Sequence, residues 1–352
     1  VNGNWTSGEA SGDTVVFTST TANAAVTDLD AGNYDTSGIV DAARRPAVTT
    51  TQGQNLDNVG ATSTNGVVYG QVVIADGGDA SIANVTVDGF ADASTVTSDA
   101  LENLTLRNNN EDANLTVTTA ATALNLTLDG ISSSLMDGVD ETVIDLDNVT
   151  AAENITDLTL TTEGDASSAA LVGAAVTDLT INAGAALNLD STSTDLGALL
   201  NATIAGDAAV NLGDISAANL DSFDASGNTG GVTATVSTTS TGDIEEFVFS
   251  QGDDVVTLAN VGMDVTVDGG EGTDRVVSTA ALLSGSEEVI AAGLTSFEEV
   301  EISDQVDLVS GNVEIDFGEL GFDYIVTNGT TSSAGNALRL NNLTNNSTVV
   351  LA

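Results

Sequence analysis

Strand-like segments recur along the middle of this chain at a nearly constant interval, and this repeat limits the possible folds more than any other feature. The aligned positions lie 21, 23, 21 and 24 residues apart: Leu158, Leu179, Ala202, Phe223 and Phe247. Leu104 to Leu126 is a further step of 22. Apolar residues alternate there with Thr or Asn, which is typical of a β-strand with one buried face. A degenerate repeat of about 20–24 residues predicts stacked coils, so we expect an all-β fold, a right-handed parallel β-solenoid.

Each coil is predicted to contain two strands separated by a tight turn. Residues 177–182 and 186–190 alternate on either side of Ala183-Gly184, and the next coil repeats the pattern around Gly206-Asp207. Gly and Asp favour turns, so turn chemistry and periodicity agree. The clearest strands have the form apolar-Thr-apolar: 85–87, 104–106, 115–117, 126–128, 158–160 and 179–181.

The charge of the chain excludes one class of partner. With 52 acidic and 5 basic residues the formal net charge is -47, so we expect no binding to nucleic acid. Such a charge opposes compaction unless divalent cations or salt neutralise it. Disorder is the alternative for an acidic chain rich in Thr, Asn and Gly, but hydrophobic residues make up 41%. Aromatic residues are only 3%, which predicts a core of Val, Leu, Ile and Ala.

Catalysis is not expected, because the chain has no His, Cys or Lys. Paired acids such as Asp145 with Asp147 or Glu298 with Glu299 could in principle hydrolyse glycosides. Neighbouring carboxylates are abundant in so acidic a chain, however. The five basic residues are also too scattered to suggest a uronate-binding cluster: Arg44, Arg45, Arg107, Arg275 and Arg339. We therefore predict that the protein is not an enzyme.

The sequence favours an exported protein. The absence of Cys is common in proteins exported through bacterial envelopes. No apolar run reaches the roughly 18–20 residues of a membrane span. The chain begins at Val1 without a basic and apolar leader, so we expect a processed or excerpted chain. We predict a secreted protein, extracellular or at the cell surface.

Four regions follow from composition. Residues 1–75 contain the only Pro and the only Trp and are predicted to form a cap or an atypical first unit. Residues 76–250 form the repeating solenoid body. Residues 251–280 contain the Gly-rich turns described next. Residues 281–352, with longer apolar elements, are predicted to close the end of the solenoid or to mediate assembly.

One Gly-rich segment predicts a metal site. Residues 267–276 read Val-Asp-Gly-Gly-Glu-Gly-Thr-Asp-Arg-Val and fit the Gly-Gly-x-Gly-x-Asp-x-apolar nonapeptide that binds Ca²⁺ in parallel β-rolls. A partial copy, Gly-Asp-Asp-Val-Val at 252–256, lies one coil upstream. Ions in such rolls lie between successive turns, where glycine lets carbonyls point inward and Asp supplies charge. The predicted calcium ligands come from both copies: Gly252, Asp253, Asp254, Asp268, Gly269, Gly270, Gly272 and Asp274.

Ordinary turn formation is the alternative for these residues, because Gly and Asp also make tight turns. Within the predicted set, Asp253 and Asp268 are either ligands or bystanders. Two further Gly-Asp segments are weaker candidates for an ion site. Asp76-Gly77-Gly78-Asp79 lacks the spacing of the nonapeptide, and Gly12-Asp13 is shorter still.

These motifs resemble the calcium-binding repeats of the repeats-in-toxin family of bacterial proteins. The wider chain, with its Thr/Ala/Asp/Asn-rich coils and the segment 296–302 after the motif, is similar to Gram-negative surface-layer proteins built on the same module. The resemblance implies one-step secretion, folding on meeting millimolar external calcium, and assembly into a calcium-dependent lattice or filament. The specific match covers residues 252–276, and only one nonapeptide is complete, whereas the family often has tandem copies.

The expected function is therefore structural: a secreted protein that self-assembles as a homo-oligomer or polymer, in a calcium-stabilised surface layer or extracellular filament. The alternative is a monomeric segment of a large repeats-in-toxin adhesin that binds cell-surface polysaccharide or another surface.

Two polar patterns have both a structural and a functional interpretation. Sequons at Asn84, Asn103, Asn125, Asn154 and Asn342 fit glycosylation, but most lie inside the strand pattern, which favours repeat geometry. Hydroxyl-rich runs at 18–21 and 237–241 could present a flat array that binds ice or polysaccharide, but the β-propensity of solvated Thr and Ser is the favoured explanation.

Overall fold

The computed structural model describes residues 70–76, 82–109, 112–132, 142–147, 155–215, 220–237, 246–260, 265–285, 287–331 and 335–351. Four short strands nearer the N-terminus are also described: β1 (Trp5–Ser7), β2 (Phe17–Ser19), β3 (Leu56–Asp57) and β4 (Val67–Val68). The first pair and the second pair are each antiparallel. Most of the predicted N-terminal cap lies outside the described residues.

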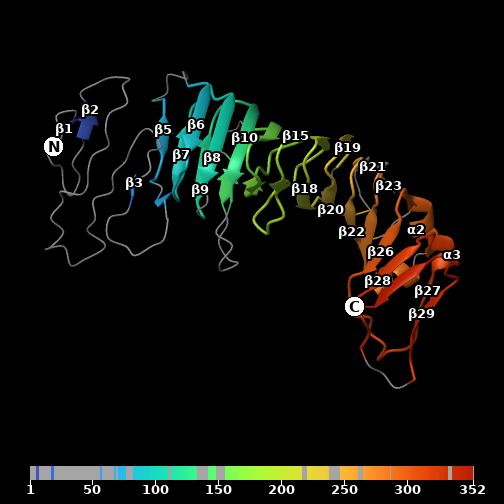
Figure 1. Cartoon of the computed structure of the whole chain (residues 1–352). Helices are drawn as coiled ribbons and strands as arrows, with labels where there is room; N and C mark the ends of the chain where they lie inside the picture. The colour runs from blue at the N-terminus through green and yellow to red at the C-terminus, as the bar shows by residue number, and fades with distance from the viewer. Residues whose placement is uncertain are drawn as a thin grey trace, which may run out of the picture.

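The described body is a parallel β-solenoid of about 11 turns, which confirms the predicted fold class. Figure 1 shows the strands stacked in chain order along an elongated molecule. One sheet runs almost its whole length, and its strands pair in the order of the sequence. They are β6 (Asn84–Asp88), β8 (Asn103–Asn109), β10 (Ala123–Ile131), β12 (Asp157–Thr162), β15 (Asp178–Ala183), β17 (Asn201–Gly206), β19 (Ser222–Asn228), β21 (Glu246–Val248), β23 (Thr266–Asp268) and β25 (Leu294–Thr295).

Two further sheets supply the other strand of each coil. The N-terminal one contains β5 (Val73–Ala75), β7 (Ser94–Thr97), β9 (Asn114–Thr118), β11 (Val143–Asp145) and β14 (Ala170–Val172). The C-terminal one contains β13 (Ser167–Ser168), β16 (Leu187–Asn188), β18 (Val210–Asp214), β20 (Val232–Ser237), β22 (Val255–Asn260), β24 (Arg275–Ser278), β26 (Glu299–Ile302), β28 (Tyr324–Thr327) and β30 (Thr348–Leu351).

The strand registers confirm the alignment made from the sequence repeat. Leu158 pairs with Leu179, Leu179 with Ala202, Ala202 with Phe223, and Phe223 with Phe247. Leu104 likewise pairs with Leu126. Equivalent apolar side chains therefore stack along the solenoid axis. This register is strongly favoured, since a slip of one residue would turn the apolar side chains of a strand to solvent.

One coil is longer than the predicted repeat. The hydroxyl of Thr156 donates to the carbonyl of Thr122, 34 residues earlier, because β10 pairs directly with β12. The strands on either side keep their register. A repeat search that assumes a constant interval loses its alignment at this point.

The core is a column of aliphatic side chains with a small aromatic cluster. Phe223 lies 5.7 Å from Phe247 and 5.1 Å from Phe249, measured between ring centroids. All three rings are buried. This cluster lies directly before the Gly-rich turns and packs the coils on which those turns are built.

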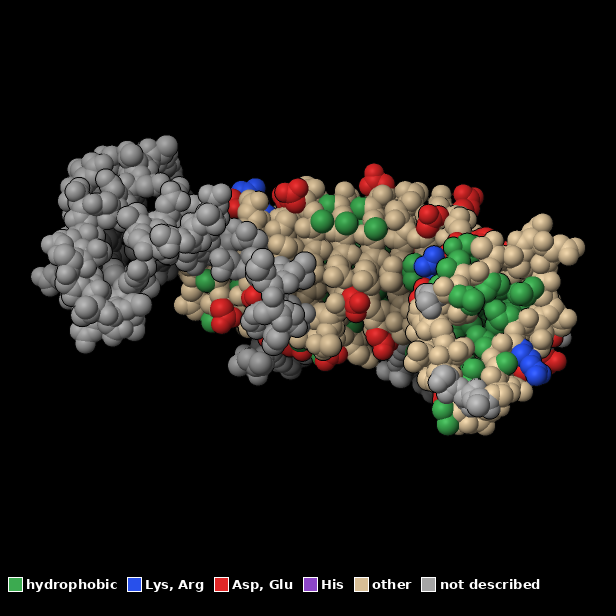
Figure 2. All heavy atoms as spheres, turned by 60° about the horizontal axis from the view of Figure 1, so that its bottom comes forward, with side chains coloured by type: hydrophobic (Ala, Val, Ile, Leu, Met, Phe, Trp, Pro, Cys, Tyr) green, Lys and Arg blue, Asp and Glu red, His purple; other side chains and the backbone are tan. Residues whose placement is uncertain are grey.

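The C-terminal region continues the stack and adds short helices. They are α1 (Ala280–Gly285), α2 (Glu287–Gly293) and α3 (Phe317–Leu320), and a two-stranded parallel sheet pairs β27 (Val313–Asp316) with β29 (Leu338–Asn341). Figure 2 shows hydrophobic side chains gathered at this end of the molecule. Leu351 is 77% exposed on β30. Among the described residues, we find no helix with the length and hydrophobicity of a membrane span.

Candidate metal centre

Three consecutive coils carry the candidate centre in stacked turns. The first turn, residues 249–254, joins β21 to β22; the second, 269–274, joins β23 to β24; the third, 296–298, joins β25 to β26. The flanking strands are paired in register, Val248 with Asp268 and Asp268 with Thr295. All eight predicted ligands therefore lie in the first two turns or at their edges. The third turn was not part of the prediction.

Glycine is required where the first two turns touch. Gly270 has a φ of 95° and Gly272 a φ of 131°, conformations that L side chains rarely adopt. A Cβ at Gly270 would overlap the carbonyl oxygen of Ser250, and one at Gly272 would lie 2.5 Å from the carbonyl oxygen of Gly252. The main chains of the two turns are therefore in direct contact.

Asp254 is buried and fully hydrogen-bonded. Only 1% of the residue is exposed. Its Oδ2 accepts from the Ser250 N–H at 2.8 Å, and its Oδ1 accepts from the Ser250 hydroxyl at 2.7 Å and from the Val232 N–H. Burial raises the pKa of this carboxyl, and the hydrogen bonds from Ser250 and Val232 oppose the shift. Asp254 thus holds its own turn together and ties it to the preceding coil.

Asp274 occupies the equivalent position one coil later but is only partly hydrogen-bonded. It is also 1% exposed. Its Oδ1 accepts from the Asp254 N–H at 2.8 Å, whereas its Oδ2 is buried and has no hydrogen-bond partner. Burial, and then the negative charges of Asp254, Glu298 and Asp253, raise the pKa of Asp274 to about 7, against the hydrogen bond from Asp254. A buried carboxylate oxygen without a donor is costly unless something else satisfies it.

The contrast lies in the residue four positions before each Asp. Ser250 supplies both its N–H and its hydroxyl to Asp254. The equivalent residue in the next coil is Gly270, which has no side chain, and its N–H donates instead to Asp268 Oδ1 at 3.3 Å. The second turn therefore lacks the donors that close the first one.

The two acids that could be ligands or bystanders are both bound to main-chain groups. Asp268 accepts from Gly270 as described. Asp253 is exposed, and its Oδ1 accepts from the Thr273 N–H at 2.9 Å. Each uses one carboxylate oxygen to hold the shape of the second turn.

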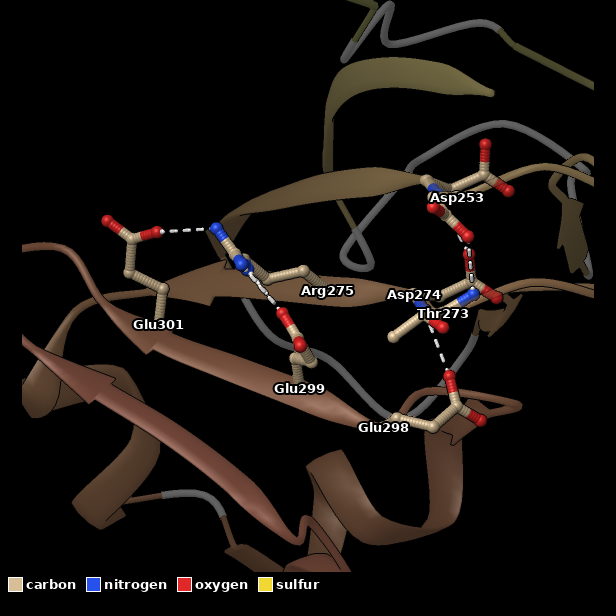
Figure 3. Close-up of polar contacts among 8 residues, drawn as sticks. Asp253, Thr273, Asp274, Arg275, Glu298, Glu299 and Glu301 are labelled. Atoms are coloured by element: carbon tan, nitrogen blue, oxygen red, sulfur yellow. Dashed lines mark hydrogen bonds and ion pairs between the residues drawn. The ribbon is translucent and has the colours of Figure 1, made fainter. Parts of the chain in front are cut away.

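The carboxylates before β22, β24 and β26 form a column along the axis, shown in part in Figure 3. Each carboxylate accepts from a main-chain N–H of the coil before it. Asp254 accepts from Val232, Asp274 from Asp254, and Glu298 Oε2 from Asp274 at 2.9 Å. The sequence suggested Glu298 as half of a catalytic pair and as part of the segment 296–302, and not as part of the metal centre. Its signal is its position: it is the acid directly before β26, 24 residues after Asp274.

Arg275 does not neutralise Asp274, although it is adjacent in sequence. Its guanidinium bonds Glu299 Oε2 through Nε at 2.9 Å and Nη2 at 2.6 Å, and its Nη1 lies 3.5 Å from Glu301 Oε2. Figure 3 shows this group directed along the sheet, away from Asp274. Successive side chains of a strand point to opposite faces, so Arg275 faces solvent and Asp274 faces the interior.

The oxygens of this centre suit a hard cation. Ca²⁺ binds carboxylate and main-chain carbonyl oxygens in irregular geometry. Asp274 Oδ2 is a buried carboxyl oxygen that lacks a donor, which is the atom such an ion would satisfy. Within the described part of the chain, no group of three or more Asp, Glu, His or Cys side chains is placed to hold a metal ion. Calcium binding here stays a prediction. Because the side chains supply too few ligands, main-chain carbonyl oxygens would have to supply the others.

The weaker metal candidates are mostly outside the described residues, which include only Asp76 from the segment 76–79 and neither Gly12 nor Asp13. The carboxylate pairs are engaged with main-chain or basic groups. Asp147 donates its N–H to Asp145 and accepts from Ala174 N–H at 2.9 Å. Glu298 and Glu299 bind different groups, the Asp274 N–H and Arg275 respectively.

The sequon asparagines on the long sheet take part in a ladder. The side-chain amide of Asn103 donates to Asn84 at 2.7 Å, and that of Asn125 donates to Asn103 at 3.0 Å. This arrangement supports the structural interpretation of these positions. Asn342 bonds Asp316, and Asn154 lies outside the described residues, as do most of the two hydroxyl-rich runs.

No protein-family model matches this sequence, and no curated protein matches it as a relative.

Proposed function

We propose that this chain is a secreted structural protein of the repeats-in-toxin type that assembles, with calcium, into a surface layer or extracellular filament. The observation that carries the proposal is the buried, partnerless Oδ2 of Asp274 in a glycine turn of an elongated solenoid. The oxygen provides a place for a divalent cation, and the solenoid provides a long, regular surface for lateral contacts.

Charge supplies the link between calcium and assembly. Chains with a formal net charge of -47 repel one another, and the repulsion is weakened by bound divalent ions or by salt. Calcium at Asp274 would satisfy its buried charge and rigidify the turns. Calcium bound at surface carboxylates of neighbouring chains would reduce repulsion between them. Export into a calcium-rich medium would then trigger both folding of the turns and association.

The test is a calcium titration of the purified chain, followed by circular dichroism and light scattering and then by excess chelator. We expect strand signal and ordered particles to rise together and to reverse on chelation. Magnesium at the same ionic strength is the control for simple screening, because Mg²⁺ gives up its water shell reluctantly. Assemblies that persist in chelator with no bound calcium would contradict the proposal.

One observation favours the alternative, a monomeric adhesin segment that binds polysaccharide. The outward side of the long sheet carries uncharged columns over several coils. Asn84, Asn103 and Asn125 form one, and the adjacent column is Thr86, Thr105, Thr127 and Thr161. Neutral amides and hydroxyls can hydrogen-bond to sugar hydroxyls. A chain that folds with calcium yet stays monomeric, and that is retained on immobilised neutral polysaccharide, would select this function.

A further inference from the structure

The sequence motif pairs the turn 269–274 with the turn before it, but the space between those two turns is closed. Gly270 packs onto the carbonyl oxygen of Ser250, and Gly272 onto that of Gly252. The Ser250 oxygen also accepts from the Glu271 N–H at 3.2 Å. Both carboxylate oxygens of Asp254 are used by main-chain and hydroxyl donors. No carboxylate oxygen of Asp254 is left for an ion.

The partnerless oxygen of Asp274 lies beside Gly269 and the third turn. Oδ1 is taken by the Asp254 N–H of the preceding coil. Oδ2 lies by Gly269, where an added Cβ would be 2.9 Å from it. The same Cβ would overlap the carbonyl oxygen of Ser296, which is the residue stacked on Gly269 in the following coil. The glycine therefore leaves a space onto which one carboxylate oxygen and one main-chain oxygen both face.

Glu298 adds a second carboxylate on this side. It belongs to the same turn as Ser296 and is exposed, with Oε2 bound to the Asp274 N–H. Figure 3 shows Glu298 and Asp253 on opposite sides of the second turn, each reaching a main-chain N–H of that turn.

We propose that the cation lies between the turn 269–274 and the following turn 296–298, where Asp274 Oδ2 and the Ser296 carbonyl bind it and Glu298 supplies a second carboxylate. This inference rests on the calcium binding of the proposed function, and it places the ion one coil further along the chain than the sequence motif does. The turn that pairs with the one complete motif is then 296–298, which lacks the nonapeptide. It contains Ser296, a non-glycine residue with a φ of 60°.

Carbonyl NMR on the unaltered chain separates the two positions. Carbonyl-¹³C serine combined with ¹⁵N-labelled phenylalanine and glutamine gives signals from only the Ser222–Phe223, Ser250–Gln251 and Ser296–Phe297 peptide bonds. Calcium is added to saturation in moderate salt, which screens weak surface sites. We expect the Ser296 carbonyl signal to shift by several linewidths, while Ser222, distant from the centre, stays in place.

The outcomes distinguish the inference from the function on which it rests. A shift at Ser250 with Ser296 unchanged would place the ion between the first two turns and overturn the inference alone. No shift at either serine, together with no heat of calcium binding, would overturn both the inference and the calcium-dependent function.

Two conservative variants provide a matched comparison, because each keeps an oxygen that can accept its main-chain N–H. Glu298→Gln removes a charge on the side of the third turn, and Asp253→Asn removes one on the side of the first. We expect Glu298→Gln to weaken calcium affinity about tenfold and Asp253→Asn by less than about twofold, since ligand charge sets affinity. Isothermal titration measures both. Equal effects, or the reverse order, would overturn the proposed position.

Discussion

Asp254 and Asp274 occupy equivalent positions in adjacent coils, but their environments differ. Both are buried, and both accept a main-chain N–H from the coil before them. Ser250 completes the hydrogen bonding of Asp254, whereas Gly270 leaves one oxygen of Asp274 without a donor. The same motif residue can therefore maintain the fold in one coil and be available to a ligand in the next. The two cases differ in whether the main-chain N–H four positions earlier bonds the carboxylate.

The largest effect is expected from Asp254→Asn. An amide in place of Oδ2 or Oδ1 would meet the N–H of Ser250 or Val232, so two donors would face each other in a buried site. We expect a loss of about 2–4 kcal/mol in the free energy of unfolding, with or without calcium. Urea denaturation measures it. A loss that is clearly larger with calcium than with chelator would mean that Asp254 is a ligand after all.

The next effect is the pH dependence of the calcium-free chain. The pKa of Asp274 is about 7 in the folded state and near 3.8 when unfolded. Between these values the folded chain binds the extra proton, so this group's contribution to stability falls as pH rises from about 4 through about 7. Urea midpoints at pH 5, 6, 7 and 8 in high salt, with chelator, should decrease in that order.

Asp274→Asn serves as the control for that slope, which should flatten in the variant. A slope between pH 5 and 8 that is the same in both chains would assign it to other groups. Added calcium should oppose the decrease in the unaltered chain, because the ion binds the charged carboxylate.

Asp274→Asn should itself raise the stability of the calcium-free chain but abolish the stabilisation by calcium. Without calcium at pH 8, removal of a buried charge with a partnerless oxygen should raise the free energy of unfolding by about 1 kcal/mol. The stabilisation that calcium gives the unaltered chain should disappear. Thermal denaturation with calcium and with chelator measures both effects. A variant that is destabilised without calcium would show that Asp274, like Asp254, mainly serves the fold.

The smallest effect is expected from Arg275→Gln. Arg275 links β24 to Glu299 and Glu301 of β26 on a face that is partly exposed to solvent. Pairs of this kind contribute little, so we expect a loss of less than about 1 kcal/mol that diminishes with added salt. Calcium affinity measured by titration should stay within about twofold. A larger drop in affinity would mean that the Arg275 pairs position the third turn.

The repeat in the sequence was sufficient to predict the body of the fold. Apolar residues at near-constant spacing, such as Leu158, Leu179 and Ala202, are stacked as aligned, because each coil must place the same face over its neighbour. The long coil between β10 and β12 broke the interval without breaking the register. The two aligned series were found separately in the sequence, and only the strand pairing, Leu126 with Leu160, shows how they join.

The candidate centre was predictable in part. The Gly-rich spacing identified Asp274 and the glycines that allow two turns to touch, since those conformations are nearly restricted to Gly. Ser296 and Glu298 were not recognised as part of it, because neither belongs to the nonapeptide and a main-chain carbonyl can be supplied by any residue. The only sequence signal was the position of Glu298 directly before a strand.

The sequence alone established the strand alternation, the turn residues, the net charge of -47 and the motif at 267–276. Each of these depends on residue types and their spacing over a short stretch of chain, or on a sum over residues. The hydrogen bonding of each buried carboxylate does not. Asp254 and Asp274 follow the same Gly-x-Asp pattern, yet one has every oxygen satisfied and the other does not. The difference lies in the main-chain N–H four residues earlier, which bonds the carboxylate at Ser250 but bonds Asp268 at Gly270. Gly270 packs on the carbonyl oxygen of Ser250 in the preceding coil, so the path of its turn is fixed only once the coils have stacked.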